Sequence, residues 1–488
     1  MKFTYISLIS LLFSTGNCAV QQAPFQLPVK EVTPAHGRFL HITDIHMDQH
    51  YVYGATIQSD CHRKPKKHKH KKKEQGLLAG YWGAPGTDCD SSPRFVYHSI
   101  DWIAKEWKDK IDFVIWTGDN ARHDGDPYIT RTQKEITGYN QKVTKALQEA
   151  FAHPDRTIPI VPCLGNNDVH PHNQFRGMKN NPQLLTFSDI WSDFIPADQQ
   201  RHFKRGGYFA VDVAQGIRVL SLNSLYFFGS NDVVNSCSDP TSPGARHVRW
   251  LKKELKRAER DQVKVIIMGH VPPTVKTFKD SCLDDYIKLS TRHADRIMGH
   301  MYGHANFDHF QIISRQFSSV STVQQDASRF VSGLRKQYRM VKKVHDRSEL
   351  VAIHVAPPLL PLFQPTFRIN QYNTNQSSPQ FGQWLKYTQY YSNLTYWNEQ
   401  RDRWTHKPIP PVFEIEYETD KDYHLPDLTT ASWLDFAERL GSKKHKKIWK
   451  MYVANLFVRT NNKWYGQSVP DSSDSYWRTI KDLFHWFF

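Results

Sequence analysis

Short apolar runs that end in Asp, Asn or His recur along this chain. The first is Phe39 to His46, where an apolar strand pattern is followed by Asp44 and His46. Because alternate residues of a strand face the same side, these two side chains point toward one place beyond the strand. Four later runs, each closed by a glycine turn, deliver Asp119, then Asn166, then His270, and finally His304 with Asn306. One such run is an ordinary solvated loop, but five in series predict a shared site.

Helical patterns separate these strands. Ser92-Pro93 predicts a helix that extends to Lys108, because Ser is a good cap and Pro suits the first helical position. Helices are also predicted at 130–151 and 245–261, with two strands in 207–223 that turn at Gln215-Gly216. Strands that alternate with helices predict an α/β sheet core.

Beyond Gly303 the periodicity weakens. The elements expected there are strands at 349–356 and 411–418, and two short helices within 432–457 that meet at Gly441-Ser442. The chain has 488 residues, of which 39% are hydrophobic, enough for one large core or two smaller ones. A disordered protein is therefore excluded.

The formal net charge of +16 favours an anionic partner, such as nucleic acid, membrane lipid or polyphosphate. Part of this charge lies in the run Arg63 to Lys73, which repels itself and predicts a solvated loop. We expect this loop to collect a polyanion; the alternative is a surface segment without a specific role. The expected contacts are Lys66, Lys67, Lys71 and Lys72. We find no nucleic-acid-binding module, so no specific nucleic-acid partner is expected.

The apolar run from Phe3 to Phe13 is typical of a secretory signal, with cleavage after Cys18 or Ala19. The alternatives are an uncleaved anchor and a buried N-terminal helix. Residues 1–18 are thus the predicted signal and 19–36 an extended leader; no membrane span is expected after cleavage.

A secretory route predicts oxidised cysteines. We expect disulfides between Cys61 and Cys89 and between Cys237 and Cys282, because each pair brackets a loop-rich insertion, and a buried free thiol at Cys163. Asn375-Gln-Ser and Asn393-Leu-Thr are candidate glycosylation sites.

The candidate ligands are carboxylate, imidazole and amide groups without cysteine, a set that suits Zn, Mn, Fe, Co or Mg. The full set is Asp44, His46, Asp119, Asn166, His270, His304 and Asn306. Seven ligands are too many for one ion. Two ions about 3.5 to 4 Å apart form the site type that cleaves phosphate esters and anhydrides. Asp119, from the middle of the series, is the expected bridge between them.

These spaced motifs resemble the calcineurin-like metallophosphoesterase family, which implies a four-layer α/β/β/α sandwich with two metals at the loop ends. The segment His41-Ile-Thr-Asp-Ile-His and the late Pro365-Thr-Phe-Arg368 resemble its acid sphingomyelinase branch. Within that branch, Gly118-Asp-Asn-Ala-Arg-His-Asp124, Leu164-Gly-Asn-Asn-Asp168 and the segment 80–89 are most similar to fungal endopolyphosphatases.

The resemblance implies a role for each ligand. Asp44, His46, Asp119 and Asn306 would hold one metal, and Asp119, Asn166, His270 and His304 the other. It also implies a metallophosphoesterase domain at 37–360, with a basic insertion at 61–89, and a C-terminal region at 361–488 packed on the core.

Two positions depart from the family pattern. Asn167 stands where the family usually has a histidine that protonates a leaving alkoxide, a contribution of about 10² to 10⁴ in rate. A phosphate leaving group is a much weaker base, so this loss favours a phosphoanhydride substrate. His123 remains a candidate proton donor. Asn306 replaces a second histidine, which makes one site richer in oxygen and favours Mn, Mg or Co over Zn.

We therefore expect an endopolyphosphatase that cuts inorganic polyphosphate internally. The alternatives are a sphingomyelinase-type phosphodiesterase and a polyanion-binding protein without catalysis; a nuclease is disfavoured by the missing nucleic-acid module. The resemblance implies the vacuole lumen, with the vacuole membrane through an uncleaved anchor, or secretion, as alternatives. The sequence leaves the metal identity and the oligomeric state open.

Overall fold

Two six-stranded sheets form the centre of the protein. The structure, a computed structural model, describes residues 36–65, 77–177, 180–315 and 327–459. The first sheet has the spatial order β12 (Glu414–Glu418), β11 (Trp384–Tyr391), β10 (Thr366–Asn373), β1 (His36–Ile42), β2 (Phe113–Trp116), β3 (Ile160–Pro162). The second has the order β4 (Phe209–Ala214), β5 (Ile217–Ser221), β6 (Lys264–Met268), β7 (Ile297–Tyr302), β9 (Val351–Val355), β8 (His309–Ile313).

Parallel pairing lies in the middle of both sheets. Strands β1, β2 and β3 run parallel, and so do β5, β6, β7 and β9, whereas the flanking strands are antiparallel. Parallel strands bring their carboxyl ends to one edge of a sheet. The loops after β1, β2, β3, β6 and β7 therefore leave from corresponding edges of the two sheets.

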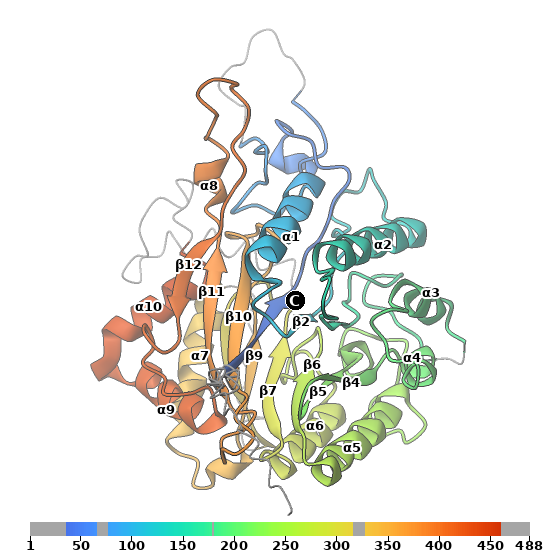
Figure 1. The fold of residues 1–488 in the computed structure, drawn as a ribbon, viewed down its shortest axis with the longest axis vertical. Helices are drawn as coiled ribbons and strands as arrows, with labels where there is room; N and C mark the ends of the chain where they lie inside the picture. Colours follow the sequence, from blue (N-terminus) through green and yellow to red (C-terminus); the bar gives the residue numbers. More distant parts are fainter. Residues whose placement is uncertain (1–35, 66–76, 178–179, 316–326, 460–488) are drawn as a thin grey trace, which may run out of the picture. The chain divides into compact units, whose positions relative to one another are not determined.

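Helices cover the outer faces of the sheets (Figure 1). The α-helices are α1 (Pro93–Trp107), α2 (Gln133–Ala150), α3 (Pro182–Ile190), α4 (Gln200–Gly206), α5 (Pro243–Asp261), α6 (Asp280–Arg292), α7 (Ala327–Val341), α8 (Leu394–Trp397), α9 (Thr430–Gly441) and α10 (Lys446–Leu456). Short 3₁₀ helices occur at Ile57–Ser59, Ser224–Tyr226, Arg347–Glu349 and Lys443–His445.

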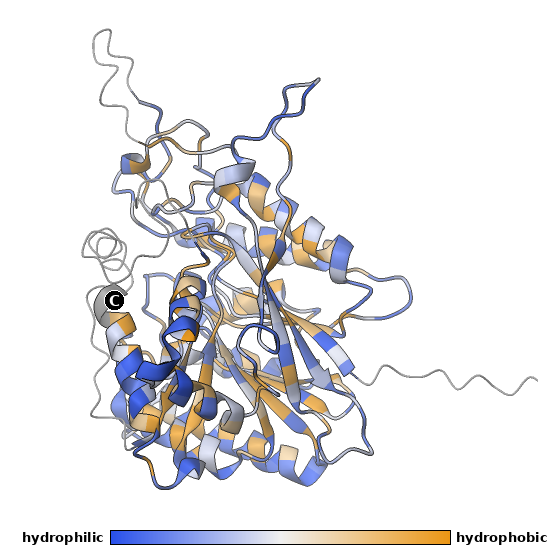
Figure 2. Cartoon of the chain, turned by 90° about the vertical axis from the view of Figure 1, so that its left-hand side faces the viewer, coloured by the Kyte–Doolittle hydropathy of each residue, from blue (hydrophilic) through white to orange (hydrophobic). Residues whose placement is uncertain are grey.

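Contacts between elements give four layers. On the first sheet, Trp102 of α1 packs against Phe367 of β10, with ring centroids 6.2 Å apart. Helices α5, α6, α7 and α9 contact strands of the second sheet. The two sheets meet where Trp384 of β11 packs against His354 of β9, with ring centroids 4.8 Å apart. Apolar residues lie on the strands and on the helix faces toward them (Figure 2). The predicted four-layer α/β/β/α architecture is confirmed.

Local signals explain where the predicted helices begin. The Ser92 hydroxyl accepts a hydrogen bond from the Phe95 amide (3.3 Å), and Pro93 is the first residue of α1. The patterns at 130–151 and 245–261 form α2 and α5, and 432–457 forms α9 and α10. The paired strands of 207–223 are β4 and β5.

Some elements were not predicted from the sequence, in part because their inward-facing residues are polar. Strands β10 and β11 were not predicted, because inward residues such as Arg368 and Gln389 are polar. In the folded chain the Arg368 Nε donates to Gln389 Oε1 (2.7 Å), and its guanidinium lies 2.8 Å from the Asp308 carboxylate. Both side chains of this ion pair are buried. Helices α3, α4, α6 and α7 and strand β8 were also missed.

Some predicted segments lie outside the described residues. These are the signal at 1–18, the leader at 19–36 except for His36, and the lysines Lys66, Lys67, Lys71 and Lys72. Among the helices that the structure describes, none combines the length and hydropathy needed to cross a bilayer. Strands β10 to β12, from the predicted C-terminal region, complete the sheet that begins with β1. The boundary expected at residue 360 stays a prediction.

Both expected disulfides are present. Cys61 pairs with Cys89 and Cys237 pairs with Cys282, with Cα atoms 5.7 and 4.9 Å apart. Cys163 is buried and free, as predicted. The first disulfide closes the insertion at 61–89 beside the loop after β1.

Candidate active site

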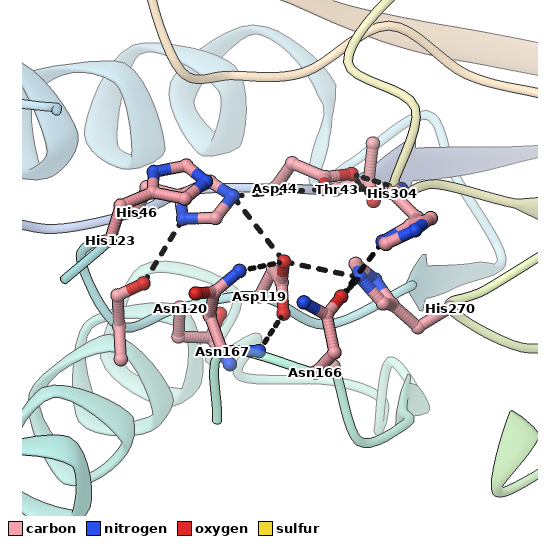
Figure 3. A network of polar contacts seen from close by, with 12 residues as sticks. Thr43, Asp44, His46, Asp119, Asn120, His123, Asn166, Asn167, His270 and His304 are labelled. Carbon is pink, nitrogen blue, oxygen red and sulfur yellow. Dashed lines mark hydrogen bonds and ion pairs between the residues drawn. The ribbon is translucent and has the colours of Figure 1, made fainter. Parts of the chain in front are cut away.

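The Asp119 carboxylate lies at the centre of the predicted ligands (Figure 3). Its Oδ2 is 3.1 Å from His270 Nε2 and 3.5 Å from His46 Nε2. Loops from both sheets therefore meet at this carboxylate, because Asp119 follows β2 in the first sheet and His270 follows β6 in the second.

Two groups of potential metal ligands share Asp119. Ligand atoms of Asp44, His46 and Asp119 lie within 4.8 Å of one another, and so do those of Asp119, His270 and His304. Asn166 joins the second group, since its Oδ1 is 2.8 Å from both His270 Nε2 and His304 Nδ1. Asp119, which belongs to both groups, is the residue that the resemblance assigns to both metal sites.

Asn306 lies on the wall of the same cavity. The cavity has a volume of about 430 Å³ and is also lined by Asp119, Asn166 and His304. Asn306 is 1% exposed, and its Oδ1 has no hydrogen-bond partner. The structure thus brings all seven predicted ligands into one region of the molecule.

The backbone at this site is strained. Five of the seven residues have positive φ: Asp44 (49°), His46 (43°), Asp119 (57°), His304 (72°) and Asn306 (57°). A residue with a side chain pays about 1 to 3 kcal/mol in such a conformation, and these residues concentrate at functional sites. Positive φ at five of the seven predicted ligands thus agrees with the side-chain chemistry of the site.

Glycine allows the β2 and β3 loops to approach each other. A Cβ on Gly165 would lie 2.1 Å from Asp119 Oδ1. A Cβ on Gly118, which has a φ of 83°, would lie 2.7 Å from the Gly165 amide nitrogen. Any larger residue at either position would push Asp119 away from its neighbours.

Hydrogen bonds orient the ligand atoms inward. The Nδ1 of His46 faces the Ala121 carbonyl (3.0 Å), and the Nδ1 of His270 faces the Thr117 carbonyl (2.8 Å). Each carbonyl accepts the Nδ1 proton, which leaves Nε2 toward Asp119, the arrangement typical of metal-binding histidines. The Asn166 amide nitrogen donates to Asn173 Oδ1 (3.0 Å), which turns its oxygen toward His270 and His304.

The residues fit divalent cations. His46 Nε2 and Asn306 Oδ1 are buried atoms without a hydrogen-bond partner, and such atoms are costly unless they bind something. The remaining donors are oxygen and imidazole nitrogen, which Mn, Mg, Co and Zn accept.

The electrostatics of the site also favour positive charge. Burial by itself would lower the pKa of His270, but the Asp119 and Asp44 carboxylates raise it to about 9. Burial would raise the pKa of Asp119, but His270, His46 and the Asn167 amide hold it well below its usual range. Burial and neighbouring His270 lower the pKa of His304 to about 3, so its imidazole is neutral and the lone pair of its unprotonated nitrogen can bind a cation.

The candidate proton donor His123 and Asn167, at the position of the family's catalytic histidine, have different surroundings. His123 stacks on His46, with ring centroids 4.1 Å apart, and lines the cavity. Asn167 donates from its backbone N–H to Asp119 Oδ1 and from its side-chain amide to Asp119 Oδ2, both at 2.8 Å. Asn167 therefore holds the central carboxylate in place.

Sequence reasoning missed two carboxylates at this site. Asp90 accepts hydrogen bonds from the backbone N–H and Nδ1 of His123, both at 2.7 Å. Asp168, which is fully buried, accepts bonds from backbone groups of both the β2 and β3 loops. Asp168 ends one of the quoted motifs, so a signal for it existed. Asp90 directly follows Cys89, the last residue of the insertion, and has no strand pattern before it.

The predicted glycosylation sites lie away from this cavity. Asn375 is exposed in the turn between β10 and β11, and Asn393 is the partly buried cap residue of α8. Modification at either residue stays a prediction.

Comparison with known families assigns the class. The calcineurin-like phosphoesterase family matches residues 37–304, more than half of the chain. This chain belongs to that family.

Individual proteins that are similar to this chain share one name. A Cryptococcus neoformans protein named endopolyphosphatase is 34% identical over 420 residues, covering 74% of this chain and 61% of the relative. Proteins of the same name from Candida glabrata and Saccharomyces cerevisiae are 41% and 40% identical over 283 residues. Each match covers 56% of this chain, and 42% and 41% of those two relatives. The matched part spans less than two thirds of the length of all three.

Proposed function

We propose that this protein is an endopolyphosphatase that uses two divalent metal ions to hydrolyse internal phosphoanhydride bonds of inorganic polyphosphate. The proposal joins the chemistry of the site to the name shared by the similar proteins. In this assignment Asp44, His46, Asp119 and Asn306 hold one ion. Asp119, Asn166, His270 and His304 hold the other.

Two bound ions would polarise the phosphoryl group and lower the pKa of the attacking water. The protein's own part is to fix the ligands. The histidines are held by backbone carbonyls, and Asp119 is held by both nitrogen groups of Asn167. The oxygen-rich site with Asn306 favours Mn, Mg or Co over Zn.

The surroundings of Asn167 favour a polyphosphate substrate over an alkyl phosphoester. Its side-chain nitrogen donates to Asp119, and its Oδ1 accepts from the Arg131 guanidinium (3.1 Å). This position therefore has no group that could protonate a leaving oxygen. A polyphosphate leaving group is a weak base and tolerates that loss, whereas an alkoxide does not.

His123 is the remaining proton donor that we assign. Its Nδ1 is engaged with Asp90 Oδ1 at 2.7 Å, which makes Nε2 the nitrogen that would give a proton to the departing phosphate. The imidazole ring of His46 stacks on the His123 ring and holds it in place. His123, paired with Asp90, can therefore protonate a weakly basic leaving group although Asn167 replaces the histidine of the family.

Product sizing tests the proposal. Purified protein is incubated with long-chain polyphosphate and each of Mn²⁺, Mg²⁺, Co²⁺ and Zn²⁺, and chain lengths are resolved on gels. We expect chains of intermediate length to appear early. Release of single phosphates alone would reject internal cleavage, and faster turnover of a choline phosphodiester would favour a sphingomyelinase-type enzyme.

Variants connect this activity to the site. We expect Asp119→Ala to abolish hydrolysis, whereas Asp101→Ala, on the exposed side of α1, keeps it. Substoichiometric metal in the supplemented wild-type protein, together with no turnover, would favour a polyanion-binding protein.

We also propose a secretory route that ends in the vacuole lumen. The two disulfides support an oxidising compartment. Microscopy of a tagged chain, with reductant-free mass measurement of its N-terminus, tests both the location and the cleavage expected after Cys18 or Ala19.

A further inference from the structure

The cavity beside Asp119 is larger than one phosphoryl group needs. Its volume of about 430 Å³ falls in the range of whole small-molecule sites, about 300 to 1,000 Å³. It extends from Asn166 and His304 to a wall made by Phe228, Ser230 and Lys276.

The charge of this wall suits an anion. Among the described residues that line the cavity, Asp119 is the only carboxylate, and it belongs to the proposed metal ligands. Lys276 brings a positive charge, and Ser230 and His172 bring groups that can donate hydrogen bonds. Burial lowers the pKa of Lys276, because its ammonium is partly removed from water. A partly desolvated ammonium interacts more strongly with an anion than a fully hydrated one does.

The turn that carries Lys276 is held rigidly. The Thr274 hydroxyl accepts the Lys276 amide (3.3 Å) and lies 2.8 Å from the Thr277 hydroxyl. The Thr277 carbonyl accepts the Gly229 amide (2.6 Å), which ties this turn to the segment of Phe228. The Phe228 ring in turn packs edge-on against His304, with ring centroids 5.4 Å apart. Lys276 is thus placed relative to the site by backbone contacts.

The surroundings of His123 carry both signs of charge. His123 also lines a second, smaller cavity of about 60 Å³. Four carboxylates line that cavity, those of Asp60, Asp88, Asp90 and Asp126, and so do Arg122 and His62. Asp90 is paired with His123, and Asp126 with Arg63 and His62.

We propose that Lys276, with Ser230 and His172, forms a second phosphoryl subsite, which binds the phosphate next to the one that is attacked. This inference rests on the proposed function, since it assigns a second contact between the protein and the polyphosphate chain. Such a subsite selects chains with at least two linked phosphoryl groups over monoesters and diesters with a neutral substituent.

Binding of analogues that resist hydrolysis tests the subsite apart from catalysis. Methylenediphosphonate has two linked phosphoryl groups, and methylphosphonate has one. Calorimetric titrations at saturating Mn²⁺ compare the wild-type protein with Lys276→Met, Lys276→Arg and the control Lys279→Met. Lys279 lies three residues after Lys276, directly before α6. It carries the same charge and does not line the cavity.

We expect Lys276→Met to weaken diphosphonate binding about 10- to 100-fold, the value of one charge-assisted hydrogen bond, and to change methylphosphonate binding less than twofold. Lys276→Arg should keep most of the affinity, and Lys279→Met should keep all of it. The subsite is rejected if Lys276→Met binds the diphosphonate normally, if it loses both ligands equally, or if Lys279→Met has the same effect.

The two proposals fail differently. If product sizing shows no cleavage of polyphosphate but the diphosphonate result holds, the subsite stands and the proposed substrate is wrong. If polyphosphate is cut internally and Lys276→Met binds the diphosphonate as the wild type does, the function stands and the subsite is wrong.

Discussion

The Asp168 carboxylate joins the two loops that carry Asp119 and Asn166, and its removal should destabilise the whole protein. Asp168 is fully buried, and five hydrogen-bond donors reach it at 3.3 Å or less. These donors are the backbone N–H groups of Asp119 (2.9 Å), Asn120 (2.8 Å), Ala121 (3.3 Å) and Gly165 (3.1 Å), and the side-chain amide of Asn140 (3.1 Å).

The magnitude follows from the donors left behind. Asp168→Ala leaves four backbone N–H groups without an acceptor, and each buried unsatisfied group costs about 1 to 3 kcal/mol. Water that enters the vacated space satisfies part of them, so we expect a loss near the lower bound, about 4 kcal/mol. With an unfolding entropy of about 2.1 cal/mol/K per residue over the folded part, this loss lowers the thermal midpoint by roughly 4 to 5 °C.

Calorimetry and urea denaturation measure the effect, each with metal present and with metal removed. Asp168→Asn keeps one acceptor oxygen and should fall between the wild type and Asp168→Ala. Asp101→Ala removes an exposed carboxylate from α1 and should change the stability by less than about 0.5 kcal/mol. An Asp168→Ala midpoint within about 1 °C of the Asp101→Ala midpoint would refute this reasoning.

Three further predictions concern other parts of the site. Burial disfavours the charged form of His62, but hydrogen bonds to Asp48 (2.7 Å) and Asp126 (2.6 Å) raise its pKa. The stabilisation by His62 is therefore complete at pH values below about 6.5, and it is lost as the pH rises through the raised pKa of the folded state. Thermal midpoints from pH 5 to 9 should therefore fall more steeply in the wild type than in His62→Gln, and parallel curves would contradict the assignment. Asp90→Asn should lower kcat about 10²-fold for an alkyl phosphodiester and less for polyphosphate, because His123 loses its carboxylate partner and a strongly basic leaving group needs the proton more; equal losses in steady-state assays would argue against proton donation. Chelation with EDTA should lower the thermal midpoint, with full recovery on adding Mn²⁺, since a ligand at 100 times its Kd stabilises by about 2.7 kcal/mol; an unchanged midpoint would show that the ligands are not occupied.

Much of the sheet core was readable from local pattern. The parallel strands are rich in apolar residues, because both faces are covered, and several are followed by glycine and by Asp, Asn or His. That signal depends only on residues within one strand and its turn. The same local information located the caps of α1 and the brackets of both insertions.

The later strands were not readable in this way. Strands β10 and β11 bury Arg368 and Gln389 against Asp308 and each other, so their inward face is polar. Whether such side chains face solvent or a partner depends on residues that are distant in sequence. No periodicity within a single strand records that pairing.

The candidate site likewise has features that the sequence predicts and features that only the tertiary structure shows. The seven predicted ligands come from strand ends, and the sequence by itself determined that they exist and in which order they occur. Only the tertiary structure decided that Asn167 holds Asp119, and that Asp90 and Asp168 support the loops of the site. Asp90 contacts His123 from 33 residues away, and His304 donates its amide to Asp44 across 260 residues. The type of residue at a strand end is a local property of the chain, whereas its partner is set by how two sheets pack, and packing is the sum of many distant contacts.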